Sequence, residues 1–270
     1  MFVDVHTHLT HEKFRGDLEN VISNARKSGC GALVVNGLEP QSNREILSMA
    51  ENHDIVYAAL GIYPSQGIAE SHPSEQLKLK PFDVSAEIEH IEKQAAIGKI
   101  IAVGECGLDG YWHDKESFAA QEKVFEKLIQ IAVEYDLPII VHSRKLEKRC
   151  IEILSSHQAT KVLFHCFCGK TKLAIANAEK YGWYFSIPAN IKRAENFQVM
   201  SKKLPAERIL TETDAPYLPP EKGQRNEPQN VVGTVTEIAR LREVQPEDMK
   251  ATIWKNFQQL FGTLENHTDN

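Results

Sequence analysis

The stretch FVDVHTH at residues 2–8 decides the fold once its pattern is followed along the chain. A short apolar, β-branched segment of this kind favours a buried strand. Residues i and i+2 of an extended segment point to the same side, so His6 and His8 are predicted to face the same way at the strand's carboxyl end. A single histidine at a strand end is most often an incidental polar residue. For two histidines at this spacing, binding of a shared metal ion is about as good an explanation as chance.

Four later apolar stretches also end in side chains that can bind a metal. They are AVGECGLD at residues 102–109, PIIVHSR at 138–144, VLFHC at 162–166 and ILTETDAP at 209–216. The residues concerned are Glu105, His142, His165 and Asp214. Each has an ordinary structural explanation when taken alone, and for Glu105 alone a helix cap or a salt bridge is the better one. Their shared position at strand ends favours a common role.

Short apolar segments alternate with longer amphipathic ones along the whole chain, which is the pattern of repeated βα units with a parallel sheet. The predicted strands are Phe2–Val5, Ala32–Asn36, Val56–Gly61, Ile100–Gly104, Pro138–Val141, Val162–Phe164, Trp183–Ile187 and Ile209–Thr213. The predicted helices are Leu18–Ser28, Ser42–Asn52, Val84–Ile97, Ser117–Tyr135, Leu146–Ser155, Thr171–Lys180, Ala194–Lys203, Val231–Arg242 and Pro246–Phe261.

Repeated βα units of this number allow either a closed barrel or an open doubly wound sheet. The carboxyl ends of barrel strands converge on one face, so a barrel brings all the ligand-type side chains to one site, whereas an open sheet spreads them along a wide edge. We therefore predict an α/β fold, a (βα)8 TIM-type barrel with an extra C-terminal helix, as a single domain over residues 1–264. Residues 67–81 are expected to form a long loop and residues 265–270 a frayed tail.

Composition agrees with one soluble, globular domain. The chain has 270 residues, of which 42% are hydrophobic and 25% charged. It shows no signal-peptide pattern and no apolar run of membrane-spanning length. Five cysteines without a repeated spacing favour a reducing compartment, and we expect a cytoplasmic protein with no obligate protein partner. The net charge of −6 argues against a regulator of duplex DNA, but not against an enzyme whose bound ions reverse the field inside a cleft.

Imidazoles and carboxylates together suit Zn, Mn or similar divalent ions better than an iron–sulfur or thiolate-rich centre. Cys166 and Cys168 flank this region without a second cysteine pair, so neither is expected to be a ligand. Two ions bridged by Glu105 would stabilise the attacking and leaving oxygens of a displacement and lower the pKa of a bound water. Asp214 is placed to take the proton from that water, so hydrolysis is the predicted reaction class, with Asp214 and Glu105 as catalytic residues.

The sequence resembles the TatD-type metal-dependent deoxyribonucleases of the amidohydrolase superfamily. The likeness covers nearly the whole chain and rests on the order and spacing of six motifs. These are DVHTHL, VGECGLD, PIIVHSR, HCFCG, LTETDAPYL and RNEP at residues 225–228.

The resemblance implies a (βα)8 barrel with two divalent ions, of Zn, Mn or Mg. It implies that His6, His8, Glu105 and Asp214 bind one ion, and that Glu105, His142 and His165 bind the second. The implied activity is cleavage of phosphodiester bonds in DNA, as a 3′-to-5′ exonuclease acting on single strands or 3′ ends.

One position departs from the family pattern. The family commonly carries G-x-H-P after the third strand, whereas this chain reads GIYP and places Tyr63 there. A phenol can donate a hydrogen bond to a phosphate oxygen but is neutral where a histidine can be charged. Arg144 and Arg225 are predicted to bind phosphate, since a guanidinium offers two parallel donors. Lys192 and Arg193 are weaker candidates, better explained as solvated surface charge.

Two other functions fit the same residues. The first is a small-molecule amidohydrolase or phosphoesterase on the same barrel, favoured if Tyr63 and the loop at residues 67–81 narrow the cleft. The second is a metal-bearing scaffold or nucleic-acid-binding module without catalysis. The presence of all six ligand-type residues argues against the second function.

Overall fold

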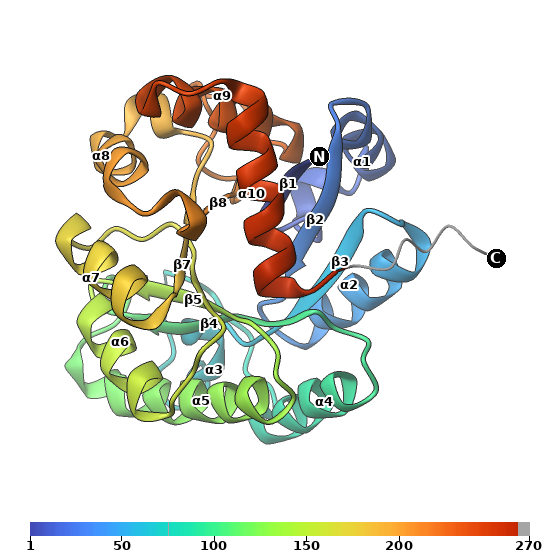
Figure 1. Cartoon of the computed structure of the whole chain (residues 1–270). Coiled ribbons are helices and arrows are strands. Elements are labelled where there is room, and N and C mark those ends of the chain that lie inside the picture. Colours follow the sequence, from blue (N-terminus) through green and yellow to red (C-terminus); the bar gives the residue numbers. More distant parts are fainter. Residues whose placement is uncertain (75, 264–270) are drawn as a thin grey trace. The chain divides into compact units, whose positions relative to one another are not determined.

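The computed structural model describes residues 1–74 and 76–263. Eight strands form one sheet in the order β1 to β8, and the registered strand pairs are parallel. The last strand also lies beside the first, because the Asp214 N–H donates to the His6 carbonyl and the Thr211 hydroxyl to the Val3 carbonyl. A doubly wound sheet reverses its strand order part-way, so this sequential order is that of the predicted (βα)8 barrel (Figure 1).

The chain divides into two compact units, each described by itself. The terminal unit comprises Met1–Val35, Met49–Tyr57 and the chain from Lys170 onward, and the central unit comprises Asn36–Ser48 and Ala58–Gly169. The terminal unit contains β1 (Phe2–Thr7), α1 (Leu18–Lys27), most of β2 (Cys30–Asn36), α7 (Thr171–Tyr181), β7 (Tyr184–Ile187), α8 (Glu195–Lys203), β8 (Ile209–Thr211), α9 (Val231–Arg242) and α10 (Pro246–Phe261). The central unit contains most of α2 (Pro40–Asn52) and of β3 (Val56–Leu60), then α3 (Pro64–Gly67), α4 (Val84–Ala96), β4 (Ala102–Asp109), α5 (Lys115–Glu134), β5 (Ile139–Arg144), α6 (Glu147–Ser156) and β6 (Val162–Phe164).

In the terminal unit, helix α10 packs against β1 and β8, as Figure 1 shows with the helix in red. Met249, Ile253 and Phe257 recur every four residues and are buried, so one face of the helix covers the strands. The prediction of an extra C-terminal helix is confirmed, with its bounds at Pro246 and Phe261.

In the central unit, helix α5 packs against β4, burying Phe125, Leu128 and Ala132. Strand β4 is buried along its whole length, including its polar residues, and pairs with β5 from Val103 to Asp109. Burial on both faces is what distinguishes a parallel barrel strand from an edge strand. The carboxyl half of β4 is therefore a rigid support for any side chain it carries.

Each predicted strand and helix is present, but the predicted carboxyl ends of some strands are wrong. Strand β1 runs to Thr7 instead of Val5, β5 runs to Arg144 instead of Val141, and the difference is largest for β4. The prediction ended this strand at Gly104, whereas it runs to Asp109. The apolar pattern stops at Gly104, yet the backbone of residues 106–109 continues to pair with residues 141–144 of β5. Strand β8 is shorter than predicted, because the Thr213 N–H donates to the Asp4 carboxylate instead of to a strand.

The long loop predicted at residues 67–81 is borne out where it is described, since residues 68–74 and 76–81 contain neither helix nor strand. The short helix α3, with Pro64 at its first position, was not predicted. The predicted frayed tail lies outside the described residues, and the single domain stays a prediction. None of the five cysteines forms a disulfide. Within residues 1–74 and 76–263, a search of the helices finds no candidate for a membrane span.

Gly107 provides a test of how closely β4 and β5 must approach. Its φ is +141°, and a Cβ placed on it would lie 2.0 Å from the His142 carbonyl oxygen. Gly107→Ala therefore has to push the strands apart, and we expect a loss of at least about 3 kcal/mol in the free energy of unfolding. Urea denaturation measures this loss. The matched control is Gly98→Ala, at a φ of +67° with no atom within 4 Å of the added Cβ, which should cost only about 1–2 kcal/mol. Equal losses in the two variants would contradict the close approach.

Candidate metal centre

Three ligand-type atoms converge in the central unit, one from each of three consecutive β segments. Glu105 Oε1 on β4 lies 2.9 Å from His142 Nδ1 on β5 and 2.9 Å from His165 Nε2, which directly follows β6. The two imidazole nitrogens are 3.4 Å apart. Glu105 and His165 are buried and His142 is largely so. We call Glu105, His142 and His165 the central triad.

The geometry of the central triad fits a divalent ion. Ligand atoms bound at about 2.0–2.2 Å from one ion lie roughly 3.0–3.5 Å from each other. The three separations in the triad have this size, and all three atoms lie within 4.8 Å of one another. A buried carboxylate beside two imidazoles is also the mixed nitrogen and oxygen donor set of zinc-like ions.

Asp109 lies behind His142 and was missed by the sequence prediction. Its Oδ2 atom is 2.9 Å from His142 Nε2, the ring nitrogen opposite the one that faces the triad. A carboxylate that accepts from one imidazole nitrogen fixes the proton there and leaves the other nitrogen free to bind a metal. The sequence did contain a signal, because Asp109 is four residues beyond Glu105, on the same side of an extended strand.

The hydrogen bond between His142 and Asp109 shifts the pKa values of the two side chains in opposite directions. Burial lowers the pKa of the His142 imidazole, but its hydrogen bonds to Asp109 and Glu105 raise that pKa to about 9. For Asp109, burial has the opposite effect and raises the pKa. The hydrogen bonds from His142 and from the N–H groups of Tyr111 and Trp112 outweigh burial and lower this pKa to about 2. Asp109 is therefore an ionised acceptor at neutral pH.

Tyr63, at the position of the family's usual histidine, is held by the same carboxylate. Its hydroxyl donates to Asp109 Oδ2 at 3.1 Å and lies 3.5 Å from His142 Nε2. Burial and the carboxylates of Glu105 and Asp109 raise the pKa of the phenol far above its ordinary value, so it stays a neutral donor. The structure thus places Tyr63 beside His142, a candidate metal ligand. Its predicted contact with substrate stays a prediction.

A second group of ligand-type atoms lies in the terminal unit. His6 Nε2 and His8 Nε2 are 3.1 Å apart, and they lie 3.7 and 3.3 Å from Asp214 Oδ1. Two imidazole nitrogens at this separation repel through their lone pairs unless a proton or a cation lies between them. The predicted shared orientation of His6 and His8 is present. We call His6, His8 and Asp214 the terminal triad.

The pairing of β1 with the segment after β8 holds the terminal triad. The Asp214 N–H donates to the His6 carbonyl, and the His8 N–H donates to the Ala215 carbonyl, both at 2.8 Å. Asp214 itself has a φ of +57°, a conformation that aspartate tolerates better than most residues. These two hydrogen bonds fix the backbone of His6 and His8 relative to that of Asp214.

Buried Asp4 adds a side-chain link between the same segments. Its carboxylate accepts from the Thr213 N–H at 2.9 Å, from the Thr213 hydroxyl, and from the His6 N–H at 3.3 Å. Burial raises the pKa of Asp4 to about 7, although these hydrogen bonds lower it. Sequence analysis missed Asp4, whose signal was a charged residue inside an apolar strand, two positions before His6.

Two residues of the RNEP motif hold the loop that follows β8. Asn226 is fully buried and its amide donates to the carbonyls of Thr213, Tyr217 and Leu218. Arg225 donates to both oxygens of Asp17 and to Glu227, so its guanidinium already binds carboxylates. These contacts give Arg225 a structural role, and its predicted phosphate contact stays a prediction.

The remaining basic candidates differ in how their charges are used. Arg193 donates to the Pro219 and Pro220 carbonyls and so anchors the same loop of the terminal unit. Arg144 is exposed at the end of β5 and its guanidinium makes no ion pair among the described residues. Of the two arginines predicted to bind phosphate, Arg144 is the one whose charge is available.

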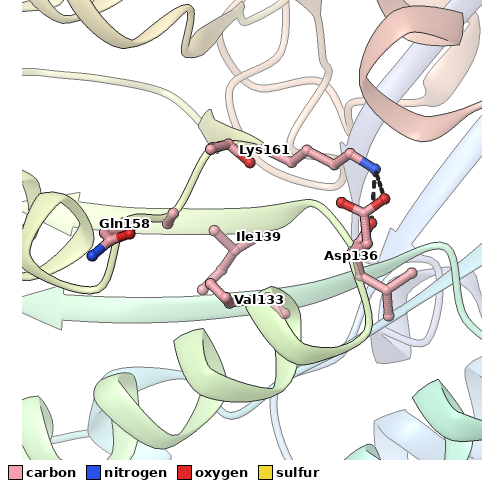
Figure 2. Close-up of a pocket in the computed structure, with 9 residues that line it drawn as sticks. Val133, Asp136, Ile139, Gln158 and Lys161 are labelled. Carbon is pink, nitrogen blue, oxygen red and sulfur yellow. Dashed lines mark hydrogen bonds and ion pairs between the residues drawn. The ribbon is translucent and has the colours of Figure 1, made fainter.

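Two further features were not predicted. Glu212, next to the terminal triad in sequence, is fully buried and accepts from the Ser186 hydroxyl at 2.6 Å. A small pocket lies at the amino ends of β5 and β6 (Figure 2), where Lys161 bonds to the Asp136 carboxylate at 2.6 Å. Because the two charged residues in this pocket neutralise each other and none of the ligand-type residues lines it, it is not a candidate active site.

Comparisons with known proteins bear on the function of these triads. A family model described as TatD related DNase matches residues 3–262. The chain is 33% identical over 268 residues to the uncharacterized metal-dependent hydrolase YabD of Bacillus subtilis, covering 97% of this chain and 99% of that protein. It is 34% identical over 271 residues to deoxyribonuclease TATDN3 of Homo sapiens, covering 97% and 95%. The crystal structure of YJJV, a TatD homolog from Escherichia coli, matches with a TM-score of 0.84 and 28% identity, covering 97% of this chain and 98% of that chain.

These similarities make the protein a metal-dependent hydrolase that acts on ester bonds, a class with which both triads agree. More narrowly, the chain belongs to the TatD family, whose model spans nearly its whole length. The predicted resemblance and the predicted barrel fold are therefore confirmed.

Asp109→Asn tests the support behind the central triad. An amide that donates to His142 Nε2 forces the imidazole proton onto Nδ1, the atom that faces Glu105 and His165. If the amide turns the other way, its NH2 group opposes the N–H groups of Tyr111 and Trp112. We expect zinc affinity to fall by roughly 10- to 100-fold, measured by titration against a chelator. Asp114→Asn, at the exposed cap of α5, is the control. Unchanged affinity in Asp109→Asn would show that Asp109 does not position the ligand.

Asn226→Ala tests the support behind the terminal triad. The change leaves the buried carbonyls of Thr213 and Tyr217 without their donor, and we expect it to cost about 2–4 kcal/mol in the free energy of unfolding. Urea denaturation gives this value, with Asn20→Ala on the exposed face of α1 as the control. The loop also carries Asp214, so hydrolysis by the folded variant should fall as well. A loss below about 1 kcal/mol would argue against the role given to Asn226.

Proposed function

We propose that this TatD-family hydrolase cleaves phosphodiester bonds in DNA, as a 3′-to-5′ exonuclease acting on single strands, with two divalent ions of Zn, Mn or Mg. The observation that carries the proposal is the central triad, in which a buried carboxylate and two imidazoles lie at ligand spacing with Asp109 behind one of them. The relative TATDN3 is named a deoxyribonuclease, and it supports DNA as the substrate.

In this proposal both triads supply metal ligands. His6, His8, Glu105 and Asp214 would hold one ion, Glu105, His142 and His165 would hold the other, and Glu105 would be shared by both. This assignment is supported by the order of the motifs along the chain and by the ligand spacings within each triad. When bound, such ions supply an activated water and neutralise the charge of a reacting phosphate.

The protein's own residues then have three tasks. Asp214, a partly exposed carboxylate next to His8, accepts the proton of the attacking water as general base. Tyr63 stays protonated, and it can donate a neutral hydrogen bond to phosphate when its single hydroxyl proton turns away from Asp109 Oδ2. Arg144 offers two parallel donors and a permanent charge. Arg225 has these donors engaged by Asp17 and Glu227, so Arg144 is the better phosphate ligand of the two.

The direct test is hydrolysis of single-stranded DNA labelled at its 5′ end, with Mg or Mn supplied. We expect a ladder that shortens from the 3′ end, and no product from a Glu105→Ala control. Duplex DNA, RNA and panels of small phosphate esters and amides are assayed in parallel. DNA degradation no faster than that of Glu105→Ala would overturn the nuclease proposal. Turnover of the small substrates alone would support a small-molecule phosphoesterase or amidohydrolase instead.

Asp214→Asn separates the roles of ligand and base. The amide keeps an oxygen that can bind metal but loses the basic carboxylate, so we expect part of the metal to remain and most of the activity to be lost. Elemental analysis and the DNA assay measure the two properties on the same preparation. The His6→Ala/His8→Ala variant should lose metal as well as activity. A fully active Asp214→Asn enzyme would rule out its role as base.

A further inference from the structure

Two large aromatic side chains are exposed directly beyond the end of β4. Tyr111 and Trp112 retain 47% and 39% of their accessible surface, and their rings meet edge to face with centroids 4.8 Å apart. Tyrosine and tryptophan usually bury most of their surface, because each contributes a large apolar area to a core or an interface. An exposed pair of such rings therefore indicates a surface that binds another molecule.

Two cations from the end of β5 accompany these rings. The Arg144 guanidinium lies 3.7 Å from the centroid of the Tyr111 ring, and Lys145 Nζ lies 4.9 Å from it. Both side chains are exposed, and neither makes an ion pair within the described part of the chain. The nearby Glu147 carboxylate accepts a hydrogen bond from the backbone N–H of Lys145 at 3.3 Å. This bond does not involve the Lys145 ammonium. The surface therefore combines flat π faces with unneutralised positive charge.

The aromatic pair is tied to the central triad through one carboxylate. Asp109 Oδ1 accepts from the backbone N–H groups of Tyr111 at 2.7 Å and Trp112 at 2.9 Å, while its Oδ2 atom bonds to His142. The other end of this loop is fixed by His113, whose Nε2 atom lies 2.8 Å from the Ser65 hydroxyl. The backbone that carries the two rings is thus held close to His142, so the loop itself needs little ordering on binding.

We propose that Tyr111, Trp112, Arg144 and Lys145 form a subsite that stacks an unpaired nucleobase and binds the phosphate next to it. Every base has a π face that stacks on an aromatic ring, and a positively charged groove follows the backbone of a single strand. Paired bases in a duplex are already stacked on each other, so this subsite selects single-stranded nucleic acid. The inference deepens the proposed function by assigning the feature that prefers single strands.

The test measures binding of a single strand to the metal-loaded protein. The probe is fluorescein-labelled oligothymidylate with phosphorothioate linkages, which resist hydrolysis, and anisotropy gives the Kd. Trp112→Ala should weaken binding on the order of tenfold, and Tyr111→Ala by a similar factor, because stacking of one base contributes at this level. Trp112→Phe retains a flat ring and should bind nearly as well as wild type, whereas Trp112→Leu should not. Since Trp112 is exposed, these variants are expected to fold, and circular dichroism verifies it.

Two further comparisons separate base stacking from charge. An abasic strand of the same length should bind wild type and Trp112→Ala equally, because it offers no base to stack. Arg144→Gln should reduce the slope of log K against log salt by about 0.7, the value for one phosphate contact on a single strand. Arg149→Gln is the matched control, since Arg149 is exposed on α6 but already paired with Glu122. Its salt slope should equal that of wild type.

The outcomes distinguish this subsite from the proposed nuclease activity. If wild type degrades single-stranded DNA but Trp112→Ala binds and degrades it equally well, the subsite is wrong and the nuclease proposal stands. If wild type binds the strand through Trp112 but cleaves no DNA, the subsite is supported and the nuclease proposal is wrong. Trp112-dependent binding to vesicles of anionic phospholipid, with no preference for base-bearing over abasic strands, would assign the surface to a membrane and overturn the inference.

Discussion

The hydrogen bond between Asp109 and His142 is the interaction on which the described site depends. A buried imidazole beside a buried carboxylate is costly unless each polar atom has a partner, and Asp109 provides that partner for His142 Nε2. It also accepts from Tyr63 and from the backbone of Tyr111 and Trp112. One carboxylate thus orients a candidate metal ligand, holds the residue that replaces the family's usual histidine, and fixes an exposed aromatic loop.

The terminal unit meets the same requirement with different residues. Here Asp4 joins Thr213 to the His6 backbone, and Asn226 satisfies three carbonyls of the loop that follows β8. In each unit a buried polar side chain outside the triad supports it: Asp109 bonds to the ring of His142, and Asp4 and Asn226 hold the backbone next to His6 and Asp214. Such supports cost stability when a partner is missing, because buried polar groups then remain unsatisfied. A metal site needs its ligands held to within a fraction of an ångström, and these supports meet that need.

The surface around Arg144 extends this logic from metal binding to substrate choice. A metal centre acts on the reacting ester group alone, so groups outside the ligands recognise the rest of the substrate. Exposed rings and unpaired cations next to His142 provide such groups, and they are held by the carboxylate that already orients this ligand. Arg225, by contrast, has its charge neutralised by Asp17 and Glu227 and serves the loop instead.

The sequence by itself determined the order of strands and helices, the class of fold and the candidate ligands, because each depends on local periodicity and on the position of a residue at a strand end. The roles of Asp109, Asp4 and Asn226 were not predicted, because they depend on which atoms each side chain faces in the folded chain. The partners of Asp109 and Asp4 come from residues far along the chain, and those of Asn226 from the folding of its own loop. The same holds for Arg225 and Arg144, two arginines that composition and spacing cannot tell apart. The tertiary structure alone decides that Arg225 is paired with two carboxylates, whereas Arg144 stacks on Tyr111 and keeps its charge available.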